Sequence, residues 1–422
     1  MGPRRKANAG ATPMAVVYLG TPVPAKFLAT TVNRNFEIPE NVTQNSLISS
    51  LFHRYRHDLY VITVASNFGN PSVLNRITPR QAVILDCGVR AIGVGNLNFG
   101  KPLYYLSIIV TYTLELIRVL RAHRGKSFLV VTGNAHVFTA LPVVLARLFF
   151  RLCYVPFIMG TVESPEYTGL LGVVARLTPR FIRSADATLT YVAKSALDYT
   201  NRPYLEIVYS LDDRIVQLCD QVQTERPPHQ PLTIMYAGTL DDRAGAGILL
   251  DTIRQSGEAY HWVICGKGKH AEAARDLSDQ AHNVDYLGVI RQEEVIQRLC
   301  DADLLISLRP RNNRIVSYYA SYAASAKLTE YLLSGTPVLV SDVGSIASAY
   351  RPYLNLVDGD DPATVLQAIE RINQQYDDCL QKARLGQEYV KLHATSEYQG
   401  EKIIAFLEKV WEQWARRECS RG

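Results

Sequence analysis

Short apolar runs alternate along the chain with longer segments in which apolar residues recur at helical spacing. In the first half, the apolar runs predict strands at 15–19, 59–64, 128–132, 187–190 and 207–209. Helices are predicted over Gln44–Leu51, Pro102–Leu120 and Leu141–Phe157. This alternation of strand and helix is typical of a doubly wound parallel sheet.

The same pattern starts again after a polar, proline-rich stretch at 224–231, which we interpret as a linker. The second series of apolar runs predicts strands at 233–236, 262–265, 284–287, 304–308 and 338–340. Four of them are followed by glycine or a basic residue: Gly238, Gly266, Gly288 and Arg309. The carboxyl ends of parallel strands line the ligand crevice of such a sheet, so we expect a ligand site there.

The expected fold class is α/β, with two Rossmann-like doubly wound parallel-sheet domains that face each other across a cleft. Residues 1–13 are small, polar and basic, and we expect a disordered tail. We expect the first domain at 14–223, the linker at 224–231 and the second domain at 232–395. No strand remains for residues 396–422, and we expect them to form a crossover helix that packs back on the first domain.

One stretch, Ser325–Val340, carries side chains that the fold alone does not explain. It predicts a helix that begins near Ser325 and ends at Gly335, followed directly by a buried strand. Lys327 and Glu330 stand in the first turn of this helix. A helix N-terminus with a lysine suits a diphosphate, and a carboxylate accepts hydrogen bonds from sugar hydroxyls. The alternative is a solvated helix end with an ion pair between the two residues.

The amino-acid composition and net charge limit the kinds of ligand and partner that the protein is expected to bind. The chain has 422 residues, 47% of them hydrophobic and 20% charged, which is ordinary for globular domains. A net charge of +5 suits anionic ligands or an anionic membrane surface and is weak support for nucleic acid, which we do not expect as a partner. The 7 cysteines form no CxxC pair, which indicates a reducing compartment and argues against zinc ribbons.

Two predicted helices are apolar enough to be considered as membrane-spanning segments. Pro102–Leu120 contains Glu115 and Arg118, and Leu141–Phe157 contains two arginines, so neither is expected to span a bilayer. Leu141–Phe157 and the later arginines of the first half predict a basic face instead: Arg176, Arg180 and Arg183. We therefore expect a cytoplasmic protein whose contact with the inner face of the plasma membrane is peripheral at most.

Four blocks in the second half resemble a known family. They read MYAGTLD at 235–241, ICGKG at 264–268, VDYLG at 284–288 and KLTEYLLSGTP at 327–337. In this order they resemble the nucleotide-sugar-binding domain of GT-B glycosyltransferases of the retaining family 4 type (glycosyl transferases group 1). The resemblance covers about 231–395, whereas the first half is similar only in layout.

The resemblance implies a role for each matching position. Glu330 would bind the ribose of a nucleotide diphosphate-sugar donor, and Lys327 with its helix end would hold the diphosphate. Gly238 would let the backbone approach the donor, and Val289 and Ile290 would border the base. Gly266 and Arg309 complete the donor-binding set: Gly238, Gly266, Val289, Ile290, Arg309, Lys327 and Glu330.

The sequence also departs from the family pattern. Tyr322 stands where these enzymes commonly have the first glutamate of an E-x7-E pair. The usual Gly-Arg-Leu reads Gly-Thr-Leu at 238–240, and the usual lysine falls at Ala244. Arg243 and Arg309 are proposed as substitutes, with exposed surface arginines as the alternative. These losses also admit a degenerate, non-catalytic member of the family.

The catalytic candidates are Lys327, Arg243 and His136. His136 follows a strand of the first half and is placed to face the acceptor, although a structural histidine would fit the same pattern. Glu163 is a weaker candidate, more simply a solvated loop residue. No Asp-x-Asp follows a predicted strand, and Asp301-Ala302-Asp303 precedes one, so no metal is expected to be required.

The expected function is transfer of a sugar from a nucleotide diphosphate-sugar to a lipid-linked or polysaccharide acceptor, with retention of configuration. The acceptor class and a role in cell-surface or exopolysaccharide biosynthesis rest on family analogy alone. Two alternatives stay open: a nucleotide-sugar-binding subunit without activity that pairs with an active transferase, and a sugar-nucleotide epimerase of the same fold.

Overall fold

The structure is a computed structural model, and it describes most of the chain. The described ranges are 14–22, 39–64, 76–133, 136–160, 169–211, 213–222, 228–311, 314–322 and 324–420. The expected tail at 1–13, the candidate Glu163 and part of the expected linker lie outside these ranges.

The first half of the chain forms an eight-stranded sheet in the order β10-β9-β8-β7-β1-β2-β5-β4. Neighbouring strands are parallel, except that β4 pairs with β5 antiparallel. Two short strands, β3 and β6, pair apart from this sheet. The strands are β1 (Met14–Leu19), β2 (Leu59–Val64), β3 (Ile77–Thr78), β4 (Gln81–Ile84), β5 (Arg90–Val94), β6 (Asn96–Leu97), β7 (Ser127–Thr132), β8 (Leu152–Ile158), β9 (Thr188–Thr190) and β10 (Tyr204–Glu206).

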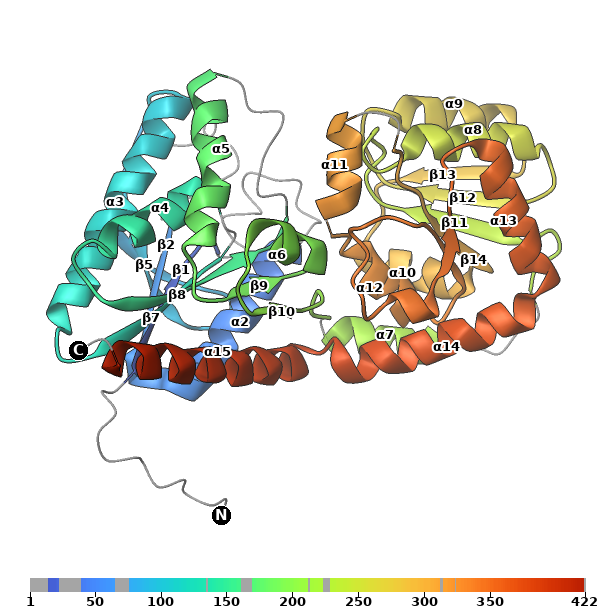
Figure 1. Cartoon of the computed structure of the whole chain (residues 1–422). Coiled ribbons are helices and arrows are strands. Elements are labelled where there is room, and N and C mark those ends of the chain that lie inside the picture. The colour runs from blue at the N-terminus through green and yellow to red at the C-terminus, as the bar shows by residue number, and fades with distance from the viewer. Residues whose placement is uncertain are drawn as a thin grey trace, which may run out of the picture.

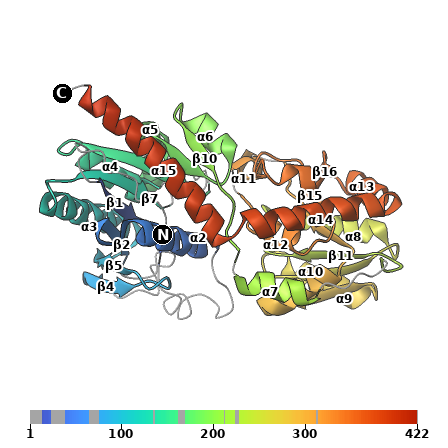
Figure 2. The same ribbon diagram turned by 90° about the horizontal axis from the view of Figure 1, so that it is seen from below.

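Helices cover both faces of this sheet because successive residues of a strand point to opposite sides. Val16 of β1 packs in one core with α2 and α15, whereas Val17 packs in another with α3 and α4. Figures 1 and 2 show these two layers around the sheet. The helices of this half are α2 (Pro39–Tyr55), α3 (Lys101–Ala122), α4 (Val137–Ala146), α5 (Gly169–Arg183), α6 (Ala193–Tyr199) and α7 (Asp213–Val222).

The second half forms a separate six-stranded sheet, all parallel, in the order β13-β12-β11-β14-β15-β16. One face packs on α7, α10, α12 and α14, and the other on α8, α9 and α13. The strands are β11 (Thr233–Ala237), β12 (His261–Cys265), β13 (Val284–Gly288), β14 (Leu304–Ser307), β15 (Val338–Ser341) and β16 (Asn355–Val357). The helices are α8 (Ala246–Ser256), α9 (Ala271–Gln280), α10 (Gln292–Asp301), α11 (Arg314–Tyr322), α12 (Lys327–Leu333), α13 (Pro362–Gln374), α14 (Tyr376–His393) and α15 (Ser396–Cys419).

The last helix, α15, leaves the second half and lies along the first (Figures 1 and 2). Leu407 and Trp414 are buried in the core that α15 shares with α2. At the surface, Arg54 Nε of α2 donates to Glu408 Oε1 over 2.7 Å. The two halves are thus connected by this helix as well as by the chain between β10 and β11.

The predicted α/β class with two parallel sheets is confirmed. Two local expectations are wrong, and one hairpin was not predicted. The predicted helix over Leu141–Phe157 is instead the end of α4, a turn and β8, whose residues are all buried. A continuous apolar run is the same signal for a buried strand and a buried helix, which explains the error. The strand expected at 207–209 is β10, three residues earlier. The β4–β5 hairpin was not predicted because its exposed positions break the apolar run.

Candidate active site

The carboxyl ends of β11, β12 and β13 and the start of α12 enclose a cavity of about 460 Å³, within the usual size of a small-molecule site. In Figures 1 and 2, α12 lies on the side of the second sheet nearer the first half. The lining residues are Ala237, Gly238, Thr239, Ala244, Cys265, Gly266, Lys267, Gly288, Val289, Ile290, Gln292, Val295, Arg309, Ala324, Ser325, Ala326, Lys327 and Glu330.

Glycines let the three strand ends approach one another closely. Gly238 and Gly266 have φ angles of +154° and +140°, which residues with a side chain rarely adopt. A Cβ atom on Gly266 would lie 1.8 Å from the carbonyl oxygen of Gly238. The Gly266 N–H donates to the Gly288 carbonyl over 2.7 Å. The floor of the cavity is therefore bare backbone, which a ligand can approach without meeting a side chain.

Lys327 is the first residue of α12, and its side chain turns into the cavity. Its Nζ lies 4.1 Å from the ring centroid of Tyr236, close enough for a cation–π interaction. Burial and the nearby charge of Arg309 lower the pKa of Lys327 to about 7, while Asp241 opposes this shift. Such a lysine gains charge when a negative ligand enters, because the ligand compensates both causes of the shift.

Arg309 follows β14 and adds a second cation to the same cavity. Its backbone N–H donates to Ser341 Oγ over 2.9 Å, which fixes the start of this loop. Burial lowers the pKa of Arg309 below its ordinary value. Among the described residues, neither the Arg309 nor the Lys327 side chain forms an ion pair with a carboxylate within 4.0 Å. Two half-buried cations without a paired anion indicate a site for an anionic ligand.

The start of α12 uses two of its backbone amides internally. Leu328 N donates to Ser325 O, and Thr329 N donates to Ala326 O. These two N–H groups are therefore not available to a ligand, which also meets the cations of Lys327 and Arg309 at this end.

Glu330 lies one turn after Lys327 and also faces the cavity. Its Oε1 accepts a hydrogen bond from Gln292 Nε2 over 3.1 Å. Burial raises the pKa of Glu330, and the bond from Gln292 opposes that shift. Val289 and Ile290 line the same side of the cavity, just before Gln292. A carboxylate beside an apolar wall suits a ligand with paired hydroxyls next to a flat ring.

The structure thus brings the seven expected donor-binding residues to one cavity, whereas Arg243 and His136 lie outside its lining. The Arg243 guanidinium lies 4.8 Å above the ring of Tyr319, with its Nε 3.8 Å from an Asp241 carboxylate oxygen. His136 precedes α4 in the first half, 5.3 Å from Phe138 between ring centroids. Burial lowers the pKa of His136 to about 4, which keeps the imidazole neutral at neutral pH.

Sequence reasoning missed Gln292 and Tyr331. The Tyr331 hydroxyl accepts from Ala237 N over 2.8 Å and donates to Ala237 O over 3.0 Å, which holds the end of β11 beside Gly238. Gln292 begins α10 directly after the Val289–Ile290 turn, a position that could have been read as facing the same ligand. Tyr331 follows Glu330 on the buried side of the helix and carried no signal beyond core packing.

The sequence of the region that forms the cavity matches a known protein family. Residues 231–375 match the sequence model of the family Glycosyl transferases group 1. The match spans β11 to α13 and includes the whole cavity. These residues of the second half therefore resemble a group 1 glycosyltransferase domain. No curated protein sequence matches the chain.

Solved structures show that the chain has the GT-B fold throughout. Sucrose-phosphate synthase from Thermosynechococcus elongatus is 15% identical with a TM-score of 0.63, over 94% of this chain and 100% of the other. HepE from Anabaena in complex with UDP is 14% identical with a TM-score of 0.59, over 94% and 100%. The trehalose 6-phosphate synthase from Burkholderia multivorans is 11% identical with a TM-score of 0.63, over 96% and 98%.

Tyr322 joins the two halves of the chain. The Tyr322 hydroxyl donates to Asp198 Oδ2 of α6 over 2.5 Å, and Lys194 Nζ lies 2.9 Å from the same oxygen. A second contact joins the hydroxyls of Tyr199 and Tyr318 over 3.1 Å. The residue that replaces the usual first glutamate therefore contacts the first half instead of lining the cavity.

Two features of the described residues bear on metal binding and on contact with a membrane. No group of three or more His, Cys, Asp and Glu side chains in the part of the chain that the structure describes is arranged to hold a metal ion. Within the same part, Pro102–Ala122 of α3 is the one helix long and apolar enough to cross a membrane, by length and composition alone.

Proposed function

We propose that this glycosyltransferase moves a sugar from a nucleotide diphosphate-sugar to a lipid-linked or polysaccharide acceptor. The observation that carries the proposal is the cavity of about 460 Å³, which holds two cations that form no ion pair within 4.0 Å with any described carboxylate and, one helical turn from Lys327, a carboxylate. A nucleotide diphosphate-sugar presents the complementary set: two phosphates, a ribose diol and a flat base. HepE, which shares the fold, was solved as a complex with UDP, and this supports a nucleotide donor.

The donor is placed by these complementary groups. Its diphosphate lies at Lys327 and Arg309, and its ribose hydroxyls donate to Glu330. Its base lies against the Val289–Ile290 turn, and the backbone of Gly238 allows the phosphates to come close. In this pose the sugar points out of the second half toward the first, where the acceptor binds.

The reaction breaks the bond between the sugar C1 atom and the diphosphate oxygen and forms a bond from C1 to an acceptor hydroxyl oxygen. The nucleoside diphosphate leaves with the bonding electron pair, and its leaving oxygen takes up the proton that the acceptor hydroxyl gives up. Fixed cations aimed at that developing charge are the main catalytic requirement, and Lys327 supplies one. We propose that configuration is retained and that these side chains replace a divalent metal.

Arg243 and His136 complete the proposed machinery as groups outside the donor cavity. The charge of Arg243 acts on Arg309, and the arginine is stacked on Tyr319 of α11. On closure of the halves it would add positive charge near the diphosphate. His136 follows β7 at the carboxyl edge of the first sheet, and its imidazole is neutral. A neutral imidazole can accept a hydrogen bond from a sugar or acceptor hydroxyl.

A thermal-shift screen against UDP-, GDP-, dTDP- and ADP-sugars tests the donor class, because a ligand that binds the folded state raises Tm. We expect one nucleotide series to raise Tm equally with and without EDTA. Transfer to polyprenyl-phosphate-linked sugars and to polysaccharide fragments is then assayed with that donor. Binding that requires Mn²⁺ would contradict the metal-free proposal. Release of a free epimerised donor, or binding without transfer to any acceptor, would favour the epimerase or the binding subunit.

A further inference from the structure

Helix α3 (Lys101–Ala122) exposes apolar side chains along one side of its length. Leu103, Leu106, Val110 and Leu114 are 53%, 56%, 48% and 47% exposed. Their spacing of three or four residues places them in one line on the helix surface. The other side of α3 packs in the core of the first half, so this stripe is additional to what the fold requires.

The stripe continues past the amino end of α3. Leu97 of β6 and Phe99 are also exposed, and Leu97 pairs with the exposed Ile77 of β3. We name the set Leu97, Phe99, Leu103, Leu106, Val110 and Leu114 the α3 apolar face. Single exposed apolar residues are common, but a continuous set usually marks an interaction site. Figures 1 and 2 place α3 at the edge of the first half farthest from the second half.

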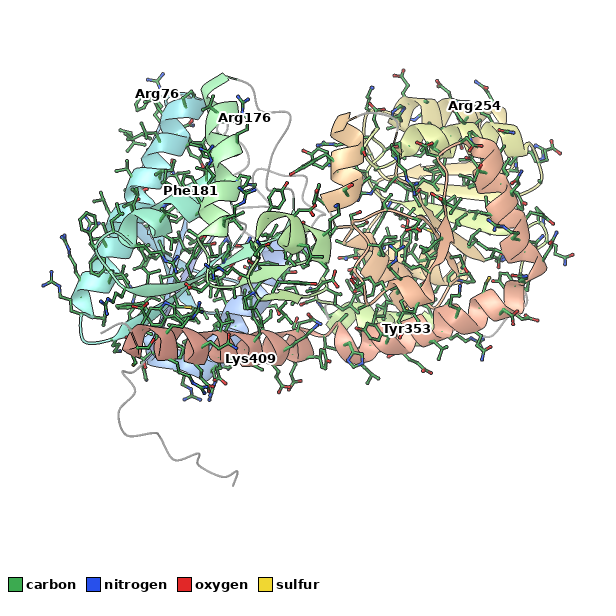
Figure 3. The ribbon with its side chains drawn as sticks, in the orientation of Figure 1. Arg76, Arg176, Phe181, Arg254, Tyr353 and Lys409 are labelled. Carbon is green, nitrogen blue, oxygen red and sulfur yellow. The ribbon has the colours of Figure 1, made fainter. Side chains whose placement is uncertain are left out.

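Charge around the α3 apolar face points to an anionic partner. Residues 1–222 contain 23 Lys and Arg against 13 Asp and Glu, whereas residues 223–422 contain 22 against 27. Within α3 the only acidic residue is Glu115, which is buried and paired with Arg80 and Arg118. Arg121 near the carboxyl end and Arg76 at the other end (Figure 3) are exposed. The stripe is therefore apolar along its centre and basic at its ends.

We propose that the α3 apolar face docks this protein on an anionic membrane surface. The leucines enter the headgroup region while the arginines contact lipid phosphates, which is how amphipathic helices bind an interface. From Leu103 to Arg121 the helix spans about 27 Å at 1.5 Å per residue, so it lies along the surface. The buried side and the Glu115 ion pairs keep α3 in the protein and prevent it from crossing the bilayer.

The position of the face suits a lipid-linked acceptor, and this step rests on the proposed function. The β6–α3 junction follows the carboxyl end of β5, and β5 runs parallel to β2, β1 and β7. Because the carboxyl ends of these strands share one edge, the amino end of the α3 apolar face lies at the edge that carries His136. A headgroup held at this edge of the sheet would thus lie on the side of the first half that carries His136.

Flotation with vesicles of phosphatidylcholine, with or without about 30% phosphatidylglycerol, tests this surface. The wild type should bind the anionic vesicles at least roughly tenfold more tightly than the neutral ones, and high salt should weaken the binding. Leu106→Glu/Val110→Glu should reduce binding to anionic vesicles by about tenfold or more, because two charges would enter the apolar region. Donor binding in solution, measured by calorimetry, should not change.

The matched control is Leu385→Glu/Leu392→Glu on α14, where the two leucines are 51% and 66% exposed in the other half. It should bind vesicles as the wild type does. If the first variant melts early, Leu103→Gln/Leu114→Gln is a milder change of the same face and should weaken binding in the same direction.

Several outcomes would overturn the proposal. Equal vesicle binding by the wild type and both α3 variants, or no binding by the wild type, would do so. Light scattering that shows a dimer for the wild type and a monomer for Leu106→Glu/Val110→Glu would also overturn the proposal, because the α3 apolar face would then be the interface with a second copy of the chain. A wild type that floats with vesicles through α3 but binds no nucleotide-sugar would support this surface and contradict the proposed function, which separates the two failures.

Discussion

The two halves use glycine at strand ends for opposite purposes. In the second half, the glycines after β11 and β12 leave bare backbone beneath a cavity with two cations. In the first half, the glycine positions after β1 and β7 are covered by protein: a Cβ on Gly133 would lie 2.0 Å from the Tyr18 hydroxyl. That hydroxyl donates to Gln44 Oε1 over 3.0 Å. A glycine at a strand end is thus compatible with a ligand or with a buried side chain.

The polar and charged side chains beside each glycine show whether a ligand or a protein side chain fills the space at that strand end. Tyr18 has its partner in Gln44, and Gln44 also accepts from Thr21 N over 3.2 Å, so this part of the first half is satisfied internally. Lys327 and Arg309 have no carboxylate partner among the described residues. The proposed function uses this difference: it assigns donor binding to the second half, and it assigns the acceptor side and the proposed membrane surface to the first.

The largest expected effect is that of Lys327→Ala on turnover. The leaving diphosphate gains negative charge as the bond to the sugar breaks, so the lysine matters more in the transition state than in the ground state. We expect turnover to fall by about a hundredfold or more, the scale of losing one preorganised donor, and donor affinity to fall less. Initial rates beside calorimetric donor binding measure the two effects separately.

The control for this change is Lys409→Ala, an exposed lysine on α15 far from the cavity (Figure 3). It should leave both rate and affinity unchanged. If Lys327→Ala also leaves both unchanged in a folded protein, the second half does not hold the diphosphate and the contrast between the halves is lost.

Glu330→Gln should act mainly on donor binding. The substitution keeps the shape of the side chain and the contact with Gln292 but removes the charge that accepts from the ribose. A hydrogen bond to a charged acceptor contributes about 1.5–3 kcal/mol, so donor affinity should fall by roughly ten- to a hundredfold. Calorimetry with the free nucleoside diphosphate and with its 2′-deoxy analogue tests this role of Glu330. The wild type should bind the ribose form more tightly than the deoxy form, and the variant should lose most of that difference in affinity.

The pH dependence of donor binding should be set by the same two residues. Lys327 attracts the diphosphate only when protonated, and its pKa in the free protein is about 7, so affinity should fall as pH rises above 7. The loss should approach tenfold per pH unit for one proton. Glu330 accepts only when ionised, and its raised pKa makes affinity fall again on the acid side. Lys327→Arg should lose the alkaline decline, because arginine stays charged. An unchanged decline in that variant would assign it to another group.

Sequence was most informative where the site is local. The helix predicted from Ser325 to Gly335 is α12, and Gly335 has the expected left-handed conformation with φ of +71°. Lys327 and Glu330 reach the cavity because a strand, a glycine turn and a helix start are fixed by neighbours in the chain. The glycines followed because parallel strands bring their carboxyl ends to one edge, whereas Val289 and Ile290 were assigned from the family resemblance.

Sequence was least informative where distant residues meet. The apolar run of β8 gave the same signal as a helix, and the strand was decided by its neighbours β7 and β9. Arg243 was expected in the site, yet it stacks on Tyr319, a partner about 76 residues away that spacing cannot reveal. The membrane contact expected at Leu141–Phe157 stays a prediction: its strand residues are buried, but Leu148 and Phe149 before them are exposed, and the α3 apolar face is a second exposed surface that spacing alone did not single out.

The smallest expected effect concerns Tyr322, where the two halves meet. Tyr322→Phe removes only the bond to Asp198, an exposed contact, so stability should change by about 1 kcal/mol or less and KM by a few-fold at most. Tyr322→Glu restores the residue that related sequences commonly have, but it places a carboxylate beside Asp198 and should weaken the contact between the halves. Thermal melts and initial rates of both variants are the measurements.

If Tyr322→Glu raises turnover despite that repulsion, the tyrosine limits catalysis at this position. If Tyr322→Phe lowers turnover as far as Lys327→Ala, the contact between the halves is part of the catalytic step, and the second half does not act on the donor alone.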